Sequence, residues 1–248
     1  MKKKFWEFRN AVDGVGELLI YGDISDVSWC GDEVTPEQFR EELDALGDVP
    51  QLNIFINSYG GDAFAGQAIY SMLKRHKASK ATYIDGIAAS IASVIAMAGD
   101  TIIMPQGSMM MIHNAWTFAA GNADELRKIA DDLEKISDSV LLPAYARSGQ
   151  SEEKIKELLA AETWLSAQDA VDLGFADVIE DAKQVAASIS GTMLTVNRLA
   201  ADIGRYKNFP VSLVTPGDKP PNTPSGEPPG DHIDAAREKE LLLTIGLI

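Results

Sequence analysis

The stretch Ile84-Asp-Gly-Ile-Ala-Ala-Ser-Ile-Ala-Ser93 joins two kinds of sequence. It follows a β-prone run at residues 81–84 and leads into an apolar segment rich in helix formers at residues 91–98. This pattern predicts a strand-to-helix turn with Ser90 at or near it. The first N–H groups of a helix lack intrahelical partners and carry partial positive charge. They therefore favour a nucleophilic hydroxyl and a carbonyl oxygen that becomes an anion.

The same residues fit a simpler interpretation. Small side chains let a buried helix pack tightly, and Ser90 then acts only as the N-cap of that helix. Serine among small residues is common where helices begin, so this stretch alone leaves both interpretations open.

Outward from the serine stretch, predicted strands and helices alternate. The strands are expected at 17–21, 51–57, 81–84, 101–104, 109–112 and 175–179, and the main helices at 35–46, 63–75, 151–160 and 166–172. This alternation predicts an α/β fold with largely parallel pairing. Catalytic groups in such folds follow the carboxyl ends of strands, and the turns after Asn57 and Ile84 both have that position.

A longer helix is predicted after Gly121-Asn122, because apolar residues then recur at alternating steps of three and four. The spacing is typical of a helix with one buried face. It fits an ordinary amphipathic helix of one domain and a contact between subunits equally well. The stripe consists of Leu126, Ile129, Leu133, Ile136 and Val140.

Composition and charge exclude several classes of protein. The 248 residues are 46% apolar, which is enough for a sizeable core, and carry a formal net charge of −15. That charge argues against binding to nucleic acid, because phosphate neutralisation needs clustered Lys and Arg. The longest nearly uncharged apolar run, 86–99, is shorter than the roughly 18 to 20 residues that a membrane span needs.

The cysteine count and the first residues indicate the compartment. Cys30 is the sole cysteine, which excludes an internal disulfide framework and fits a reducing compartment. Metal-site spacings of Cys and His are absent, and we expect neither a metal nor a cofactor. The basic start at residues 1–4 is not followed by the apolar core of a secretion signal. We expect a soluble cytoplasmic protein.

The chain changes character near residue 190. Seven of its eleven prolines fall between Pro210 and Pro229, among Gly, Asp, Thr and Ser. Such a composition buries no core and is typical of a disordered linker. We therefore expect a folded domain at 1–190, a proline-rich linker at 191–232 and a short tail at 233–248 that recovers apolar, helix-compatible residues.

A serine nucleophile needs a general base, which at neutral pH is most often histidine. His113 follows the apolar run 109–112 and is the one histidine of three that a core strand presents, since His76 ends a basic helix and His232 lies in the proline-rich region. A lone histidine after an apolar strand is more often structural than catalytic. This position alone leaves both roles open.

The remaining parts of a serine-hydrolase site are weaker signals. The turn Asn57-Ser-Tyr-Gly-Gly61 offers backbone N–H groups that, with the N–H of Ile91, would form an oxyanion hole. The two glycines also fit a merely tight turn. Glu162 precedes a strand-like apolar pair, but spacing alone does not single out one carboxylate among 37 acidic residues.

Four motifs in order along the chain carry a family resemblance, which covers roughly residues 15 to 180. They are Ile56-Asn-Ser-Tyr-Gly-Gly61, Gly86-Ile-Ala-Ala-Ser-Ile-Ala92, Met111-Ile-His113, and Glu162-Thr-Trp-Leu-Ser-Ala167 with Ala170-Val-Asp-Leu-Gly-Phe-Ala-Asp177. Together they closely resemble the proteolytic subunit of the Clp protease.

The resemblance implies a ClpP/crotonase-like fold of repeated β-β-α units and stacked homo-oligomeric rings that enclose the active sites. It implies that the apolar-striped helix after His113 is the handle that joins two rings. It also implies a serine endopeptidase with Ser90 as nucleophile, His113 as base and Glu162 as acid. The N–H groups of Gly61 and Ile91 would form the oxyanion hole.

Some positions depart from the usual family pattern. Tyr59 stands where the family usually has proline, and Glu162 where it usually has aspartate. The family usually has a proline soon after the histidine, where this chain has Asn114-Ala-Trp116. With the proline-rich extension, these departures resemble the Clp-related head-maturation proteases of phages and prophages, whose partners are capsid and scaffold proteins.

Besides a weaker possibility, a pseudoenzyme ring that only scaffolds assembly, two other functions stay open at this point. One is an ATP-dependent proteolytic subunit that an AAA+ unfoldase supplies with substrate. The other is a crotonase-type acyl-CoA enzyme, in which two backbone N–H groups hold a thioester enolate without a serine nucleophile. The motifs around Ser90 and His113 argue against the crotonase alternative.

Overall fold

The computed structural model describes most of the chain up to Phe209. The described residues are 4–12, 14–25, 35–181, 187–190, 192–196, 199–202, 204, 206, 208 and 209. Contacts divide the chain into two units, Met1–Pro216 and Gly217–Ile248, and every described residue lies in the first.

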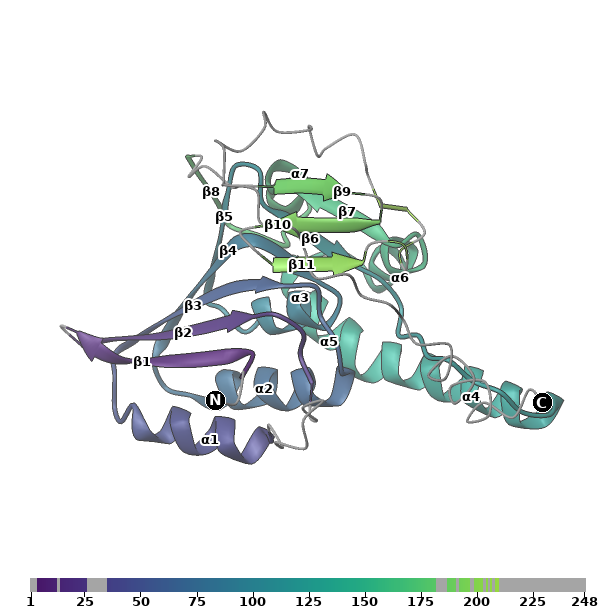
Figure 1. Ribbon diagram of the computed structural model, residues 1–248, viewed down its shortest axis with the longest axis horizontal. Coiled ribbons are helices and arrows are strands. Elements are labelled where there is room, and N and C mark those ends of the chain that lie inside the picture. The colour runs from purple at the N-terminus through teal and green to yellow at the C-terminus, as the bar shows by residue number, and fades with distance from the viewer. Residues whose placement is uncertain are drawn as a thin grey trace, which may run out of the picture. The chain divides into compact units, whose positions relative to one another are not determined.

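One mixed sheet forms the centre of this unit (Figure 1). Its main path runs β1-β2-β3-β4-β5-β8, with β6 paired to the end of β4 and β7 paired to β6. The pairs β1–β2 and β6–β7 are antiparallel and the others are parallel, which confirms the α/β prediction. The strands are β1 (Trp6–Val12), β2 (Val15–Tyr21), β3 (Gln51–Ser58), β4 (Ser79–Ala89), β5 (Thr101–Pro105), β6 (Met109–Ile112), β7 (Thr163–Ser166) and β8 (Val178–Glu180).

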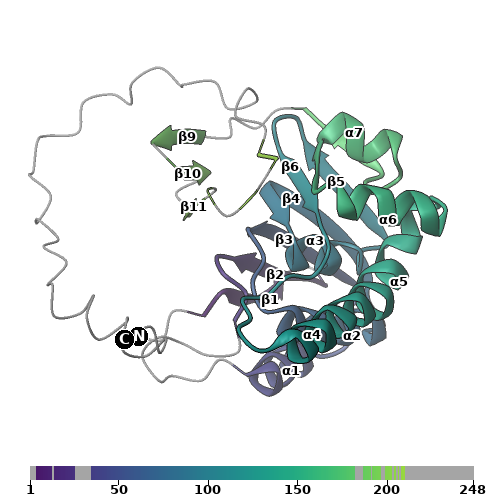
Figure 2. The same cartoon turned by 90° about the vertical axis from the view of Figure 1, so that its right-hand side faces the viewer.

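Helices α1 (Pro36–Ala45), α2 (Ala63–Arg75) and α3 (Ile91–Ala96) cover one face of the sheet (Figure 2). Helix α1 begins as the sequence predicts, with Pro36 in its first turn and the Thr35 hydroxyl accepting a hydrogen bond from Gln38 N at 3.3 Å. The side chains that seal this layer are fully or almost fully buried: Phe39, Leu43, Ile69, Leu73, Leu52, Ile54 and Ile56.

The pairing of β4 with β6 positions the residues after both strands. Ala89 is the register partner of Met111, and the Ser90 N–H donates to the Met111 carbonyl at 2.9 Å. Ser90 and His113 therefore leave neighbouring parallel strands at the same edge of the sheet. This is where α/β folds place their functional groups.

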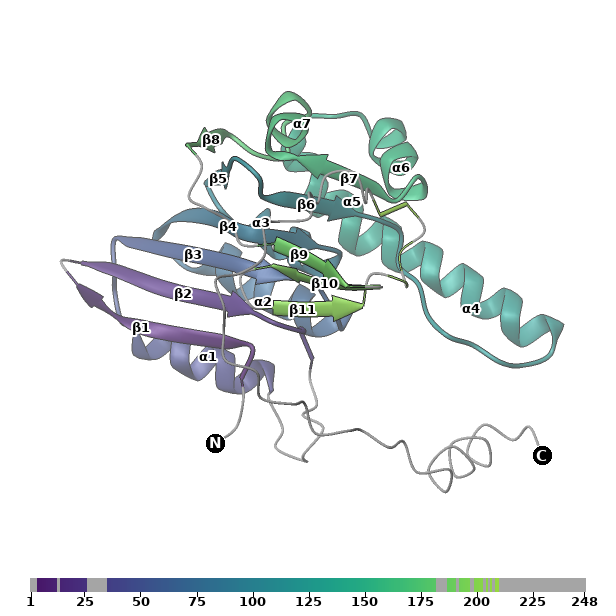
Figure 3. The same ribbon diagram turned by 45° about the horizontal axis from the view of Figure 1, so that its top comes forward.

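The predicted long helix is present as α4 (Ala123–Ile136), which continues through a π-helical turn, Ser137–Leu141, into α5 (Leu142–Tyr145). Its start is fixed by a capping box between Asn122 and Glu125. Helix α4 has no buried residue and extends away from the sheet (Figure 3). Its apolar stripe is half-buried at most positions, and Leu126 is 42% exposed.

The C-terminal part of the described chain contains α6 (Glu152–Ala160), α7 (Ala167–Asp172) and a separate three-stranded antiparallel sheet. That sheet consists of β9 (Ala187–Ser190), β10 (Met193–Val196) and β11 (Leu199–Asp202). Two of its strands, β10 and β11, lie within the predicted linker 191–232, and the predicted domain bounds stay a prediction. The last part of that linker, 211–232, and the tail 233–248 lie outside the described residues.

Two strand predictions also differ from the structure. The sequence reading missed β1, although Trp6 is buried and donates its indole N–H to the Glu42 carboxylate at 3.0 Å. The expected closing strand 175–179 is instead β8, which begins at Val178. Phe175 is buried in the turn before it, with its N–H bonded to the Ala170 carbonyl at 2.7 Å.

Candidate active site

Ser90 occupies a sharp turn between β4 and α3. Its φ and ψ are 55° and −129°, a conformation that non-glycine residues rarely adopt. Such backbone strain costs about 1–3 kcal/mol and concentrates at functional sites. Although Ser90 has the N-cap position of α3, its side chain makes no capping hydrogen bond. The simpler interpretation of Ser90 as a helix cap is therefore not supported by the geometry.

The Ser90 hydroxyl instead meets a histidine. The distance from Ser90 Oγ to His113 Nε2 is 2.7 Å, within the range of a hydrogen bond. His113 follows β6, whose pairing with β4 brings the two residues together. A nucleophile and a base within hydrogen-bond reach are the geometric signature of covalent catalysis by serine.

The nearby Ser93 has a different role. Its hydroxyl donates to the Ser90 carbonyl at 2.5 Å and is 2.8 Å from the Tyr145 hydroxyl. Ser93 and Tyr145 are both buried, and burial raises the pKa of the Tyr145 phenol. Sequence reasoning missed this pair, which holds the first turn of α3 in place behind Ser90.

The glycine turn packs directly against Ser90. A Cβ atom on Gly60 would lie 2.7 Å from Ser90 Cβ, and one on Gly61 would lie 1.9 Å from the Ile24 carbonyl oxygen. Gly60 and Gly61 also have φ values of +92° and +148°, so both positions require glycine. Glycine is thus required at both positions by close packing against Ser90 and Ile24, and not only by the tightness of the turn.

Ile24 pairs with the glycine turn through a β-bridge whose hydrogen bonds do not use the Gly61 N–H. Ile24 N–H donates to the Gly60 carbonyl at 2.9 Å, and Asp62 N–H donates to the Ile24 carbonyl at 2.7 Å. The Gly61 N–H takes no part in this bridge. Ile91 is the first residue of α3, where the N–H has no intrahelical acceptor.

Four of the five site residues expected from the sequence line one pocket of about 270 Å³. Gly61, Ser90, Ile91 and His113 are all part of its wall. The rest of the wall is mainly apolar and aromatic: Ala63, Phe64, Ala115, Trp116, Leu133, Ile136 and Leu141. Such a pocket fits an extended peptide with an apolar side chain beside the reacting groups.

Glu162, the fifth residue, lies in a second pocket of about 350 Å³ that His113 also lines. It joins α6 to β7 with a positive φ of 48°. Its Oε1 accepts a hydrogen bond from Asn208 N at 2.9 Å. The bond from His113 to Glu162 that a triad needs stays a prediction. Tyr206 and Asn208 also line this pocket, and sequence reasoning missed both because their region reads as a linker.

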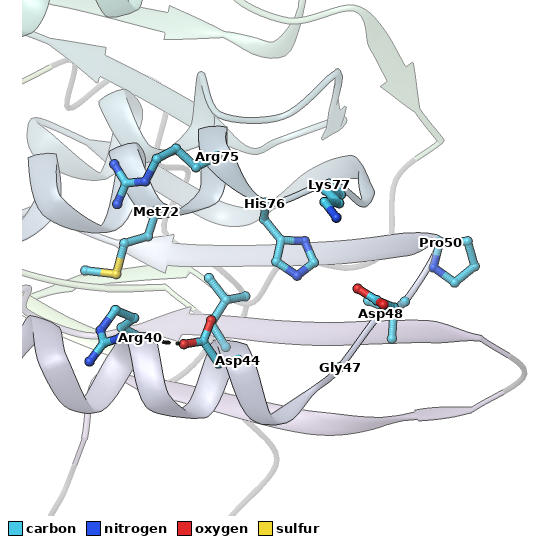
Figure 4. Close-up of a pocket in the computed structure, with 11 residues that line it drawn as sticks. Arg40, Asp44, Gly47, Asp48, Pro50, Met72, Arg75, His76 and Lys77 are labelled. Atoms are coloured by element: carbon cyan, nitrogen blue, oxygen red, sulfur yellow. Dashed lines mark ion pairs between the residues drawn. The ribbon is translucent and has the colours of Figure 1, made fainter.

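A larger pocket of about 790 Å³ lies far from these groups, between α1 and the end of α2 (Figure 4). It contains His76, whose Nδ1 accepts a hydrogen bond from Ala78 N at 3.2 Å. Burial and the neighbouring Lys80 lower the pKa of His76. The charged residues around it are mixed in sign: Arg40, Asp44, Asp48, Arg75 and Lys77. His76 thus has a structural partner, whereas His232 lies outside the described residues.

Within the described part of the chain, no cluster of three or more His, Cys, Asp or Glu side chains has the arrangement of a metal site. No helix among those same residues combines the length and the apolar character that crossing a membrane requires.

Comparison with known proteins adds the family. The model of the Clp protease family matches residues 37–183, which is more than half of the chain. The chain belongs to the Clp protease family. It is a ClpP-like serine-type peptidase with a mixed α/β fold, and both statements agree with the expectation from the motifs.

Several curated relatives carry the name ATP-dependent Clp protease proteolytic subunit. The one from Bacteroides fragilis is 31% identical over 140 residues, which cover 55% of this chain and 67% of the relative. The one from Ligilactobacillus salivarius is 34% identical over 140 residues, covering 55% and 71%. The one from Deinococcus radiodurans is 29% identical over 142 residues, covering 56% and 69%.

Proposed function

We propose that this peptidase cuts peptide bonds with Ser90 as nucleophile, His113 as general base and Glu162 as the carboxylate that orients His113. The observation that carries the proposal is the distance of 2.7 Å between Ser90 Oγ and His113 Nε2, at a strained turn beside Gly61 and Ile91. A base within hydrogen-bond distance of a hydroxyl makes the hydroxyl oxygen a better nucleophile at neutral pH.

In this mechanism, His113 Nε2 removes the hydroxyl proton as Ser90 Oγ attacks the peptide carbonyl carbon. The carbonyl oxygen becomes an anion and accepts hydrogen bonds from the N–H groups of Gly61 and Ile91. His113 then gives the proton to the leaving amine as the C–N bond breaks, which leaves an acyl ester on Ser90. Water, deprotonated by His113, hydrolyses the ester and returns Ser90 to its starting state.

The experiment that tests this function is hydrolysis of an unstructured fluorogenic peptide by the purified protein. We expect the wild-type protein to cut the peptide, and Ser90→Ala to reduce the rate to background. Ser93→Ala is the matched control because Ser93 is buried against Tyr145, and it should keep measurable activity if the variant folds. Equal rates for wild type and Ser90→Ala would contradict the assignment.

For the biological role we propose head maturation in a phage or prophage, with capsid or scaffold proteins as partners and substrates. The support is the set of departures at Tyr59, Glu162 and 114–116, together with the proline-rich extension. In this role the protein acts in the cytoplasm, and its protease domain precedes a linker and a short tail. The identity of neighbouring genes tests the proposal: portal and capsid genes support it, whereas an unfoldase gene contradicts it.

The alternative is an ATP-dependent proteolytic subunit that works with an unfoldase, and the names of the curated relatives favour it. A crotonase-type acyl-CoA enzyme is the remote alternative. The Ser90–His113 contact argues against it, because enolate stabilisation by two N–H groups needs no such pair.

We also propose that the protein assembles into stacked rings through α4, the handle. This helix buries none of its residues within the chain, although its stripe of leucine, isoleucine and valine is apolar. An apolar face that the chain covers only in part is typical of an interface. The assembly would enclose the active sites and admit only unfolded or flexible substrates.

Changing Leu133 and Ile136 together to glutamate should split the assembly. Burying two unpaired carboxylates in the interface costs several kcal/mol. Analytical ultracentrifugation should show a shift from a large oligomer to a smaller species, with loss of peptide hydrolysis because both residues also line the Ser90 pocket.

The matched control places two glutamates elsewhere on the same helix, as Lys128→Glu with Lys135→Glu. These lysine side chains are 75% and 76% exposed and lie away from the apolar stripe. The control should sediment like the wild type. A wild-type protein that sediments as a monomer would contradict the proposed ring.

A further inference from the structure

Three described residues near the end of the folded unit, Tyr206, Asn208 and Phe209, lie against the active site. We call them the C-terminal segment. The Tyr206 hydroxyl donates a hydrogen bond to the Tyr59 carbonyl at 3.0 Å, next to the glycine turn. The Tyr206 ring stands edge-on to His113, with ring centroids 6.4 Å apart, and to Trp164, at 5.3 Å. Phe209 packs on Trp164 at 4.8 Å.

Asn208 makes two hydrogen bonds to the turn that carries the proposed triad acid. Its backbone N–H donates to Glu162 Oε1 at 2.9 Å, and its side-chain Nδ2 donates to the Ala161 carbonyl at 2.7 Å. The first bond joins a fixed dipole to a carboxylate, which makes it stronger than a bond between neutral groups. The C-terminal segment therefore contacts the ends of three strands that meet at this site.

Glu162 has a physical need for such an anchor. Its side chain has one methylene more than aspartate and hence one more rotatable bond, and the residue has a positive φ of 48°. A triad acid must hold the imidazole within a narrow range of orientations. A further hydrogen bond that fixes the rotamer of the longer side chain helps its carboxylate to meet this demand.

We propose that Asn208 is a positioning residue: its N–H fixes the Glu162 carboxylate so that the free lone pairs of that carboxylate orient His113. This inference rests on the proposed function, since it assumes the role of Glu162. A carboxylate offers about four acceptor sites, so one bond from Asn208 leaves room for the imidazole N–H. Tyr206 packs beside His113 and limits how far the His113 imidazole ring tilts.

The opposite role for the C-terminal segment would be inhibition by covering the substrate pocket. The positions of Tyr206 and Asn208 do not favour inhibition. Tyr206 and Asn208 line the pocket on the Glu162 side of His113, whereas the pocket that contains Ser90, Ile91 and Gly61 is lined by neither. Among the described residues, Tyr206 and Asn208 thus contact the base and the acid and do not line the nucleophile's pocket.

The residues of the segment lie beyond 37–183, the part of the chain that the family model matches. The matched range therefore does not include this anchor. We infer that this chain completes its active site with residues from its own C-terminal extension.

The test compares two substitutions at one position in the full-length protein. Asn208→Pro removes the backbone N–H that donates to the Glu162 carboxylate. Asn208→Ala keeps this N–H and removes only the side-chain bond to the Ala161 carbonyl. We expect Asn208→Pro to lower kcat by about 100-fold, the effect of a misplaced catalytic group, with KM little changed. Asn208→Ala should lower kcat much less than Asn208→Pro, because it keeps the N–H donor to Glu162 and loses only the bond to Ala161. Equal kcat for Asn208→Pro and wild type, or a higher kcat, would overturn the inference.

A double variant separates positioning from a general loss of structure. In the Glu162→Gln background, adding Asn208→Pro should change kcat little further, because the carboxylate that Asn208 positions is already absent. A further 100-fold loss would mean that the proline acts through the fold and not through Glu162, and would overturn the inference.

The same measurements distinguish this inference from the proposed function. If Glu162→Gln alone has the kcat of the wild type, the proposed role of Glu162 fails, whatever Asn208 does. If Glu162→Gln is strongly impaired while Asn208→Pro is not, the proposed function stands and only the role of Asn208 fails.

Discussion

Replacing His113 with alanine should lower kcat for peptide hydrolysis by at least about 10⁴-fold, because His113 is the one base that the described part of the chain places at the Ser90 hydroxyl. His113 Nε2 is 2.7 Å from Ser90 Oγ, and without the imidazole the hydroxyl attacks with no general base beside it to take its proton. The fold should persist, since His113 is only half-buried and follows the end of β6. Steady-state kinetics with circular dichroism on the same samples measures both properties.

His76→Ala is the matched control for this substitution. His76 also follows an element of the same fold and has a hydrogen bond of its own, from Ala78 N, but it lies in the pocket between α1 and α2. The control should retain nearly wild-type kinetics. Equal loss of activity in both variants would show that the effect is structural, and full activity of His113→Ala would exclude His113 as the base.

Replacing Glu162 with glutamine should lower kcat by several orders of magnitude. An amide neither stabilises the imidazolium by charge nor holds the tautomer that serine needs, and the comparable change in a serine protease triad costs about 10⁴-fold. Glu162→Asp keeps the charge but shortens the side chain, so part of the activity should remain. Kinetics of both variants on one peptide substrate make the comparison.

Asp169→Asn and Asp172→Asn are the controls for Glu162, because these carboxylates follow it closely in the chain. Asp169 already accepts hydrogen bonds from Ser166 at the start of α7, and Asp172 accepts one from Gln168 at 2.8 Å. Both variants should keep most of the activity. A rate near that of the wild type for Glu162→Gln would exclude Glu162 as the acid, and a large loss of activity in Asp169→Asn or Asp172→Asn would point to that carboxylate instead.

The fold class could be predicted from the sequence because its signals are local, whereas the roles of Ser90 and His113 were indicated only together with the family motifs. Strand and helix periodicity, the Thr35-Pro36 start and the turn at Ser90 each depend on a few neighbouring residues. Strand β1 was missed because basic residues precede it and the alternation at residues 6–12 is short, so a solvated start was the simpler interpretation. Its burial depends on pairing with β2, which is a tertiary effect.

The distances within the site could not be predicted. The contact between Ser90 and His113 depends on the register of β6 beside β4, which pairs Ala89 with Met111 across a long separation in sequence. The need for glycine at 60 and 61 follows from the approach of Ile24 and Ser90, and neither neighbour is visible in a linear pattern.

The C-terminal extension shows a different limit of sequence reasoning. Composition describes the average behaviour of a segment, and a region rich in proline, glycine and polar residues predicts a linker. Composition does not describe individual residues. Strands β10 and β11 lie within the expected linker. Asn208 contacts Glu162 through a backbone N–H, which no side-chain pattern reveals.

The central claim is that Ser90 is the nucleophile, activated by His113. The most direct measurement is labelling of the native protein with a fluorophosphonate probe, followed by peptide mapping in a mass spectrometer. The account predicts one labelled residue, Ser90, with no labelling in Ser90→Ala and greatly slowed labelling in His113→Ala. Labelling that persists in Ser90→Ala, or that maps to Ser93 in the wild type, would contradict it.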